Sequence, residues 1–180
     1  MSQPVSPARV VWLMLFDIEE SRMIVTLNQT EQELAQVIAQ RRYEAARGQG
    51  LTDLKVGEQS NWETDLEGAA AEIAFCKLAN VYPDLEAGSS NIEDCYLKNG
   101  YAVDVKTTRY EGGRLLAVRW KRERSVDLYA LMVGTFPKYR LAGFMKSEDL
   151  IQEARLKDLG RGPSFAAEQS ELIKPDDVIF

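Results

Sequence analysis

The chain has 180 residues, of which 45% are apolar and 28% charged, the balance of a soluble globular domain with a core of its own. It contains no histidine, which excludes Ser-His-Asp and Cys-His nucleophiles, histidine-ligated zinc and any histidine base. With 22 basic and 28 acidic residues, its net charge of -6 argues against a protein that coats nucleic acid by bulk charge, although a local basic patch remains open.

The N-terminal segment RVVWLMLF, residues 9–16, is an apolar run that DIEE follows at once. It is too short to span a membrane and lacks a small-residue cleavage site, so we expect neither a membrane segment nor a signal peptide. We predict that residues 1–22 are an edge strand or an extension upstream of the true start, for which Met14 and Met23 are candidates. Residues 23–180 are expected to form a single domain.

A first helix is predicted over residues 27–50, LNQTEQELAQVIAQRRYEAARGQG. Thr30 and Glu33 have the spacing of a capping box, and the glycines of GQG end the helix. Apolar side chains recur along it at helical spacing: Leu34, Val37 and Ile38.

Basic residues crowd the last turns of this helix, namely Arg41, Arg42 and Arg47. They complement the negative end of the helix dipole, which explains their presence adequately. Phosphate binding by this cluster is the alternative.

A second helix is predicted over residues 62–81, after the polar linker of residues 52–61. It has a wide apolar face with many small residues, as expected for a helix packed closely on a sheet: Leu66, Ala69, Ala70, Ile73, Ala74, Phe75 and Leu78. Glu72 lies beside that face. Periodicity alone favours a solvated glutamate there.

Strands follow the second helix. Asn99-Gly100 is a two-residue hairpin signal between the alternating segments of residues 91–110. Further strands are predicted at residues 114–120, 127–134 and 139–145, followed by a short helix at residues 147–154. The tail of residues 164–177 is expected to be irregular, with at most one short edge strand. These elements predict an α/β fold of the α+β type, with a mixed, mostly antiparallel sheet flanked by helices.

The two cysteines, Cys76 and Cys95, lie 19 positions apart and have no metal-binding or redox spacing. We expect a buried helix thiol and a strand residue in a reducing cytoplasm. Three aromatic residues are also expected in the core: Phe136, Tyr139 and Phe144.

The segment GYAVDVKTTRY, residues 100–110, places charged side chains on a strand. Because strand side chains alternate between faces, its valines share one face while Asp104 and Lys106 share the other. A half-buried strand would more readily carry neutral residues at those positions. The pair therefore marks this strand as a candidate functional element.

Further acids can reach the same region. Asp94 lies on the first strand of the hairpin, whose turn can bring it near Asp104, and Glu72 comes from the preceding helix. Three converging carboxylates repel one another unless a cation neutralises them, and oxygen ligands without histidine indicate Mg²⁺ or Mn²⁺.

The order of EGAAAEIAF, Asp94 and VDVKTTR resembles the PD-(D/E)xK nuclease superfamily, in particular its small phage-type members, over about residues 62–150. The resemblance implies a restriction-endonuclease-like core and a metal-dependent deoxyribonuclease, an endonuclease rather than an exonuclease, encoded by a phage or mobile element. Cutting both strands would suit a homodimer.

The resemblance also implies roles for particular residues. Asp94 and Asp104 would hold one or two divalent metals, together with the carbonyl of Val105 and Glu72. Lys106 would orient or deprotonate the attacking water and offset charge on the phosphate. No proline precedes the first acid, so Glu93 is an alternative to Asp94. Glu67 is likewise an alternative to Glu72.

The candidate for DNA contact is RWKRER, residues 119–124, where basic side chains surround a tryptophan and suit backbone contact with base stacking. Two threonines that follow the lysine are candidates for a backbone phosphate. The full candidate set is Thr107, Thr108, Arg119, Trp120, Lys121, Arg122 and Arg124. A solvated loop with Trp120 in the core is the alternative.

A second function remains open from the sequence. The chain would then be a non-catalytic module on the same fold that binds nucleic acid or a protein partner. Asp104 and Lys106 would form a structural ion pair in that case.

Overall fold

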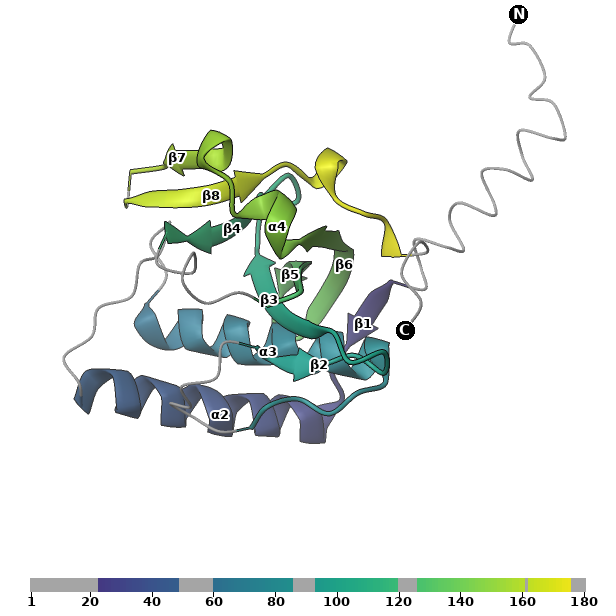
Figure 1. Ribbon diagram of the computed structural model, residues 1–180. Coiled ribbons are helices and arrows are strands. Elements are labelled where there is room, and N and C mark those ends of the chain that lie inside the picture. The colour runs from purple at the N-terminus through teal and green to yellow at the C-terminus, as the bar shows by residue number, and fades with distance from the viewer. Residues whose placement is uncertain (1–22, 49–59, 86–92, 120–125, 161, 176–180) are drawn as a thin grey trace, which may run out of the picture.

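The computed structural model describes residues 23–48, 60–85, 93–119, 126–160 and 162–175. Figure 1 shows a mixed arrangement of helices and sheets, as the sequence predicts for the fold class. Two predictions fall outside the described residues. They are the N-terminal segment of residues 1–22, with its predicted strand at residues 9–16, and residues 120–124 of the basic segment.

Within the described chain, five strands form the main sheet, in the order β1-β6-β5-β3-β2. Their bounds are Ile24–Thr26 for β1, Cys95–Tyr96 for β2, Ala102–Thr108 for β3, Leu128–Thr135 for β5 and Lys138–Lys146 for β6. β3 and β5 are parallel, with Asp104 opposite Tyr129, and the other neighbours are antiparallel. The mixed, mostly antiparallel sheet is therefore confirmed.

Two helices, α2 (Gln29–Gly48) and α3 (Asn61–Ala79), cover one face of this sheet (Figure 1). On α3, the alanines at positions 69, 70, 71 and 74 are at most 1% exposed, and they pack in one core with Val103 and Val105 of β3. Small side chains let a helix lie close to a sheet. The predicted packing of the second helix is thus confirmed.

A second sheet covers the opposite face (Figure 1). It consists of β4 (Leu115–Val118), β7 (Leu156–Asp158) and β8 (Pro163–Ala167), in the order β4-β8-β7. The described part of the tail contains one short strand, as expected, but β8 is a central strand rather than an edge strand. A strand this short carries little local signal, and one of its two partners, β4, lies far away in the chain.

The helix expected at residues 147–154 is shorter in the structure. α4 covers Ser147–Leu150, and a 3-10 helix at Glu153–Arg155 leads into β7. A second 3-10 helix covers Gln169–Glu171 after β8. In the described part of the chain, no helix is long and apolar enough to cross a membrane.

The capping box of α2 is not formed by Thr30 and Glu33. Asn28 caps the helix instead: its side-chain oxygen accepts from the Glu31 N–H at 3.0 Å, and the Glu31 carboxylate accepts from the Asn28 N–H at 2.7 Å. The same S/T/D/N-x-x-E spacing occurs twice in this stretch, so the pattern alone did not separate the two positions.

The buried face of α2 also differs from the predicted stripe. Val37 is 49% exposed, whereas Ala35, Ile38 and Ala39 are buried and Leu34 packs against the core. The buried face therefore combines Ile38 with two alanines, and Val37 lies outside it.

The predicted hairpin is confirmed, but its turn is longer than two residues. The Leu97 N–H donates to the Tyr101 carbonyl, and the Gly100 N–H donates to the Leu97 carbonyl, both at 2.9 Å. Gly100 has a φ of 87°, so the loop is the three-residue type with a left-handed glycine. Cys95 consequently pairs with Val103, which places Asp94 beside the acid-bearing part of β3.

Candidate functional site

The structure brings together four residues that the sequence singles out, here called the acidic cluster: Glu72, Asp94, Asp104 and Lys106. Glu72 comes from the buried face of α3, and Asp94 immediately precedes β2. The other two lie on β3. The charges of Glu72, Lys106 and Asp104 all act on the carboxyl of Asp94, so the cluster is one electrostatic unit.

Lys106 forms an ion pair with Asp104 on the face of β3 that the second sheet covers. The Asp104 side chain is 2% exposed and that of Lys106 is 29% exposed. Burial alone would lower the pKa of Lys106, but the charges of Asp104 and Asp94 outweigh it and the pKa is raised. Lys106 is therefore a cation at neutral pH, which suits charge stabilisation better than proton abstraction.

Asp94 is the carboxyl of the cluster that forms no ion pair among the described residues. Its Oδ2 accepts from the Val105 N–H at 2.6 Å, which fixes the carboxylate against β3. Burial raises the pKa of Asp94 well above its usual range, and the charge of Glu72 adds to this, while Lys106 acts in the opposite direction. Such a group gains from a nearby cation.

Glu72 is held by Arg42 of α2, a contact that sequence reasoning missed. The guanidinium donates to both carboxylate oxygens of Glu72 at 2.7 Å. Burial opposes the charged form of Arg42, yet the bonds to Glu72 raise its pKa overall. The sequence showed Arg42 only as one of three arginines near the helix end, because its partner lies 30 positions away.

The fit of a metal ion can be judged from these contacts. Among the described residues, no group of three or more His, Cys, Asp or Glu side chains is arranged to hold one. Both oxygens of Glu72 are already bound by Arg42. Lys106 contacts one oxygen of Asp104, and the Val105 N–H contacts one oxygen of Asp94. Mg²⁺ is commonly bound by one or two carboxylates together with water and substrate phosphates. The pair fits that donor set, whereas a three-carboxylate site does not form here.

Val105 contributes its backbone to the same place. In a β-ladder, the N–H and C=O of one residue point to the same side of the strand. Since the Val105 N–H donates to Asp94, its carbonyl lies on the Asp94 side of β3 as well.

The alternative acids bind elsewhere. Glu67 accepts from the Tyr139 hydroxyl at 2.6 Å and from the Phe136 N–H at 3.1 Å, so it anchors the turn between β5 and β6. Glu93 accepts from the hydroxyl of Tyr96 at 3.0 Å. Neither contact involves the acidic cluster.

The candidate DNA contacts are only partly described. Arg119 is exposed beyond the end of β4. The Thr108 hydroxyl accepts from the Tyr110 N–H at 3.3 Å, whereas the Thr107 hydroxyl is buried and does not face solvent. The other candidates lie outside the described residues: Trp120, Lys121, Arg122 and Arg124. Whether Trp120 contacts DNA or packs in the core therefore stays a prediction.

The residues expected in the core behave as predicted. Cys76 of α3 and Cys95 of β2 are buried free thiols. Tyr139 and Phe144 are fully buried, and Phe136 packs against the core from a partly buried position.

Comparison with known proteins finds no match to this chain among protein-family models, curated proteins or solved structures. Its function is therefore argued from the acidic cluster itself.

Proposed function

We propose that this protein is a metal-dependent nuclease that hydrolyses DNA phosphodiester bonds. The observation that carries the proposal is that one hairpin brings Asp94, Asp104 and Lys106 together, with the Asp94 carboxyl outside any ion pair among the described residues. This is the residue set needed to hold a divalent cation beside a phosphate and to offset the charge of its oxygens.

In this function Asp94 and Asp104 hold Mg²⁺ or Mn²⁺, with the Val105 carbonyl as a further donor. The bound metal would supply a lowered pKa for the attacking water and a Lewis acid at the phosphate. Lys106, a cation kept in place by its carboxylate neighbours, stabilises negative charge on the phosphoryl oxygens. The Val105 N–H orients Asp94. Glu72, held by Arg42, contributes negative charge around the metal rather than a free carboxylate.

The mode of cleavage is inferred from the resemblance to the PD-(D/E)xK superfamily. Internal cleavage of DNA by a cytoplasmic enzyme of a phage or mobile element is proposed, and a homodimer would place two sites on opposite strands. Arg119 and the basic residues after it in the sequence are proposed to contact the DNA backbone.

A second candidate is a non-catalytic binding module. Two self-contained ion pairs favour it, Lys106 with Asp104 and Arg42 with Glu72, because each cation already has a carboxylate partner. In that case the cluster would stabilise the fold and bind no metal.

Cleavage assays test the proposal. Wild type, Lys106→Ala and Asp104→Asn are compared on supercoiled plasmid, linear duplex and a branched junction, each with Mg²⁺, Mn²⁺ or EDTA. We expect metal-dependent cutting that falls about 100-fold or more in both variants, as for the loss of one transition-state donor. Lys138→Ala, at an exposed lysine of β6, is the matched control and should cut like wild type.

A thermal shift separates the two candidates even when the right substrate is missing from the assay. Metal bound to the folded state raises the melting temperature by mass action, so Mn²⁺ should stabilise wild type but not Asp94→Asn. No cutting and no shift with Mn²⁺ would instead support the binding module.

A further inference from the structure

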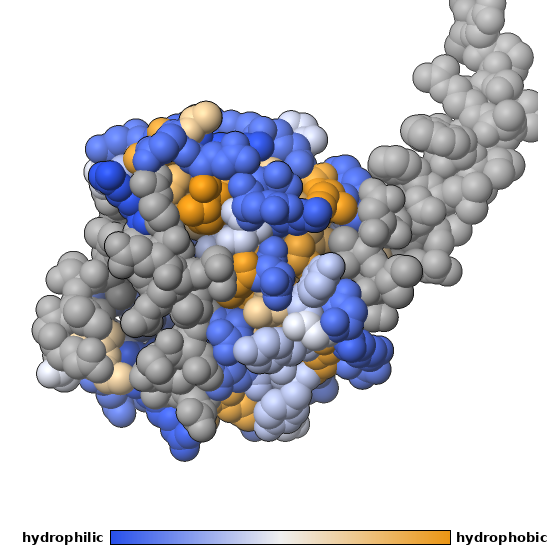
Figure 2. Space-filling model, in the orientation of Figure 1, coloured by the Kyte–Doolittle hydropathy of each residue, from blue (hydrophilic) through white to orange (hydrophobic). Residues whose placement is uncertain are grey.

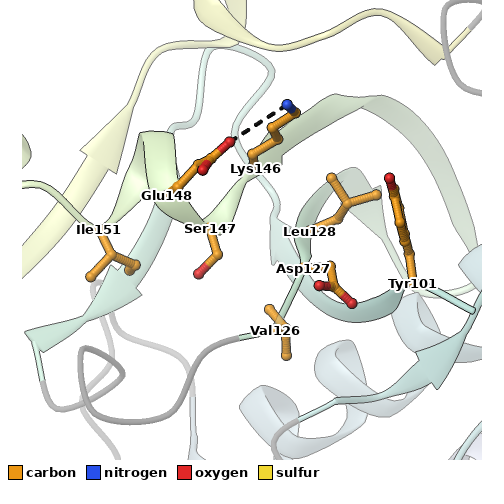
Figure 3. A pocket seen from close by; sticks show the side chains of 8 residues that line it. All are labelled: Tyr101, Val126, Asp127, Leu128, Lys146, Ser147, Glu148 and Ile151. Atoms are coloured by element: carbon orange, nitrogen blue, oxygen red, sulfur yellow. Dashed lines mark ion pairs between the residues drawn. The ribbon is translucent and has the colours of Figure 1, made fainter.

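A pocket of about 480 Å³ lies outside the acidic cluster. It is lined by residues that include Tyr101, Asp127, Leu128, Lys146, Ser147 and Ile151 (Figure 3). Its size is within the range of small-molecule sites, roughly 300 to 1,000 Å³. None of the four residues of the acidic cluster lines it.

The pocket lies where β3 and β5 begin and β6 ends. The carboxylate of Asp127 accepts from the Ala102 N–H at 2.8 Å, and the Asp127 carbonyl accepts from the Ser147 N–H at 3.0 Å. Ala102 precedes Asp104 by two residues, which is about 7 Å along a strand. The pocket therefore adjoins the acidic cluster along β3.

The walls of the pocket suit a flat ligand. Figure 3 shows Tyr101 and Leu128 along one side and Ile151 toward the other. Tyr101 is an exposed residue (49%) that lines the pocket, so its ring is accessible to a stacked ligand. Figure 2 shows apolar surface between the hydrophilic surfaces of the two outer layers.

The charged side chains of the pocket disfavour a phosphate and favour a neutral ligand that carries hydrogen-bond donors. Asp127 and Glu148 contribute two carboxylates against the single ammonium of Lys146, which lies 3.5 Å from Glu148. A carboxylate only accepts hydrogen bonds, and Ser147 both donates and accepts. Exocyclic amino groups of nucleobases are donors that carboxylates recognise.

We propose that this pocket is a base-binding subsite that takes an unpaired nucleobase with an exocyclic amino group, on a nucleotide next to the phosphate at the acidic cluster. Tyr101 stacks on the base, and Asp127 accepts from its amino group. The inference rests on the proposed nuclease function and narrows its substrate to DNA with single-stranded or unpaired nucleotides. A base within a duplex is stacked on its neighbours and cannot enter.

Binding of short single-stranded DNA in EDTA tests the subsite without cleavage. Fluorescent eight-nucleotide cytosine oligomers carry one abasic position that is moved along the strand, and affinity is read by anisotropy. We expect one position at which the abasic site weakens binding, by about 5- to 100-fold, the range for one base stacked on an aromatic side chain. At that position thymine, which lacks the amino group, should bind more weakly than cytosine.

Variants assign the effect to the pocket. Tyr101→Ala should remove the sensitivity to the abasic position, while Tyr110→Ala, at an equally exposed tyrosine outside the pocket, should keep it. Asp127→Asn retains an oxygen for the Ala102 N–H and should lose the preference for cytosine over thymine.

The outcomes separate this inference from the nuclease proposal. Three results would overturn the subsite: the same affinity at every abasic position, no binding, or equal effects of Tyr101→Ala and Tyr110→Ala. They would do so even if wild type cuts DNA and Lys106→Ala does not. A position-dependent scan that Tyr101→Ala abolishes, in a protein without metal-dependent cutting, would support the base pocket and overturn the nuclease.

Discussion

Charge in the acidic cluster does not balance residue by residue. Glu72, Asp94 and Asp104 supply three carboxylates, and Arg42 and Lys106 supply two cations that contact two of them. Asp94 has a backbone N–H as its partner, and its pKa is raised, first by burial and then by the charge of Glu72. A divalent cation would remove the repulsion among these carboxylates.

Arg42 offers a direct test of this charge arrangement. Arg42→Gln leaves Glu72 without its guanidinium, close to the other two acids. Breaking a buried pair by removing one partner costs about 3 to 5 kcal/mol, and because Arg42 is a quarter exposed we expect a loss nearer 2 kcal/mol. Urea unfolding measures it. Arg41→Gln, at the exposed neighbour on α2, should change stability by less than about 0.5 kcal/mol.

Equal stability of these two arginine variants would contradict a stabilising role for the pair. The double variant Arg42→Gln/Glu72→Gln removes the unpaired charge as well. It should therefore recover part of the stability that Arg42→Gln loses.

At the scale of elements, α3 and the β2–β3 hairpin position the site. α3 begins at a capping box in which the Glu63 N–H donates to Ser60 Oγ at 3.2 Å and the Ser60 N–H donates to the Glu63 carboxylate at 2.6 Å. It ends at Asn80 in the left-handed conformation. These ends fix the helix, and its alanines bring Glu72 close to the hairpin.

The hairpin turn can be tested at its glycine. Gly100→Ala forces a side chain into a φ of 87°, so it should cost about 1 kcal/mol, although a Cβ there meets open space. Gly112→Ala is the control, because Gly112 has open space and no positive φ. Denaturant unfolding of both variants measures the difference. A Gly100→Ala protein as stable as Gly112→Ala would show that the loop is not held in the left-handed conformation.

Elements with strong local signals were predictable. Periodicity predicted α3 and its packing, and Asn99-Gly100 predicted the hairpin. The turn length was not predictable in this way, because an Asn-Gly pair serves two- and three-residue loops alike. That single-residue change in register decides whether Asp94 lies beside Asp104.

At the scale of the whole molecule, the main sheet is covered on both faces, by helices on one side and the second sheet on the other (Figure 1). Polar groups are buried on the face of the main sheet opposite the helices. Asp104 is 1% exposed and Tyr129, its neighbour on β5, is fully buried. Burial raises the pKa of Tyr129 to about 12, and the charge of Asp104 adds to this.

The buried tyrosine predicts a loss of stability in alkali. Below pH 10 the phenol is neutral in both states, so stability is intact there. Between pH 10 and about 12 the unfolded chain releases its proton first, and the free energy of unfolding falls as pH rises. We expect a loss of about 2 kcal/mol from this group, since one pKa unit corresponds to about 1.4 kcal/mol.

Denaturant unfolding of Tyr129→Phe at several pH values between 9 and 12 checks this prediction. Its alkaline loss should be smaller than that of wild type by that amount, whereas Tyr110→Phe, at an exposed tyrosine, should match wild type. Tyr139, also buried with a raised pKa, adds a loss in the same direction to all three proteins. Identical losses in wild type and Tyr129→Phe would contradict the prediction.

The sequence by itself determined which chemistry is available and where its main elements lie. These are local properties that can be recognised within a single segment: the absence of histidine, the alternation of GYAVDVKTTRY and the apolar face of α3. The tertiary structure alone decided what surrounds the acids. The bidentate contact between Arg42 and Glu72, the burial of Asp104 and the pocket beside β3 each depend on residues distant in the chain. Such contacts depend on how the layers pack, and the periodicity within one segment does not indicate which residues of other segments it will contact.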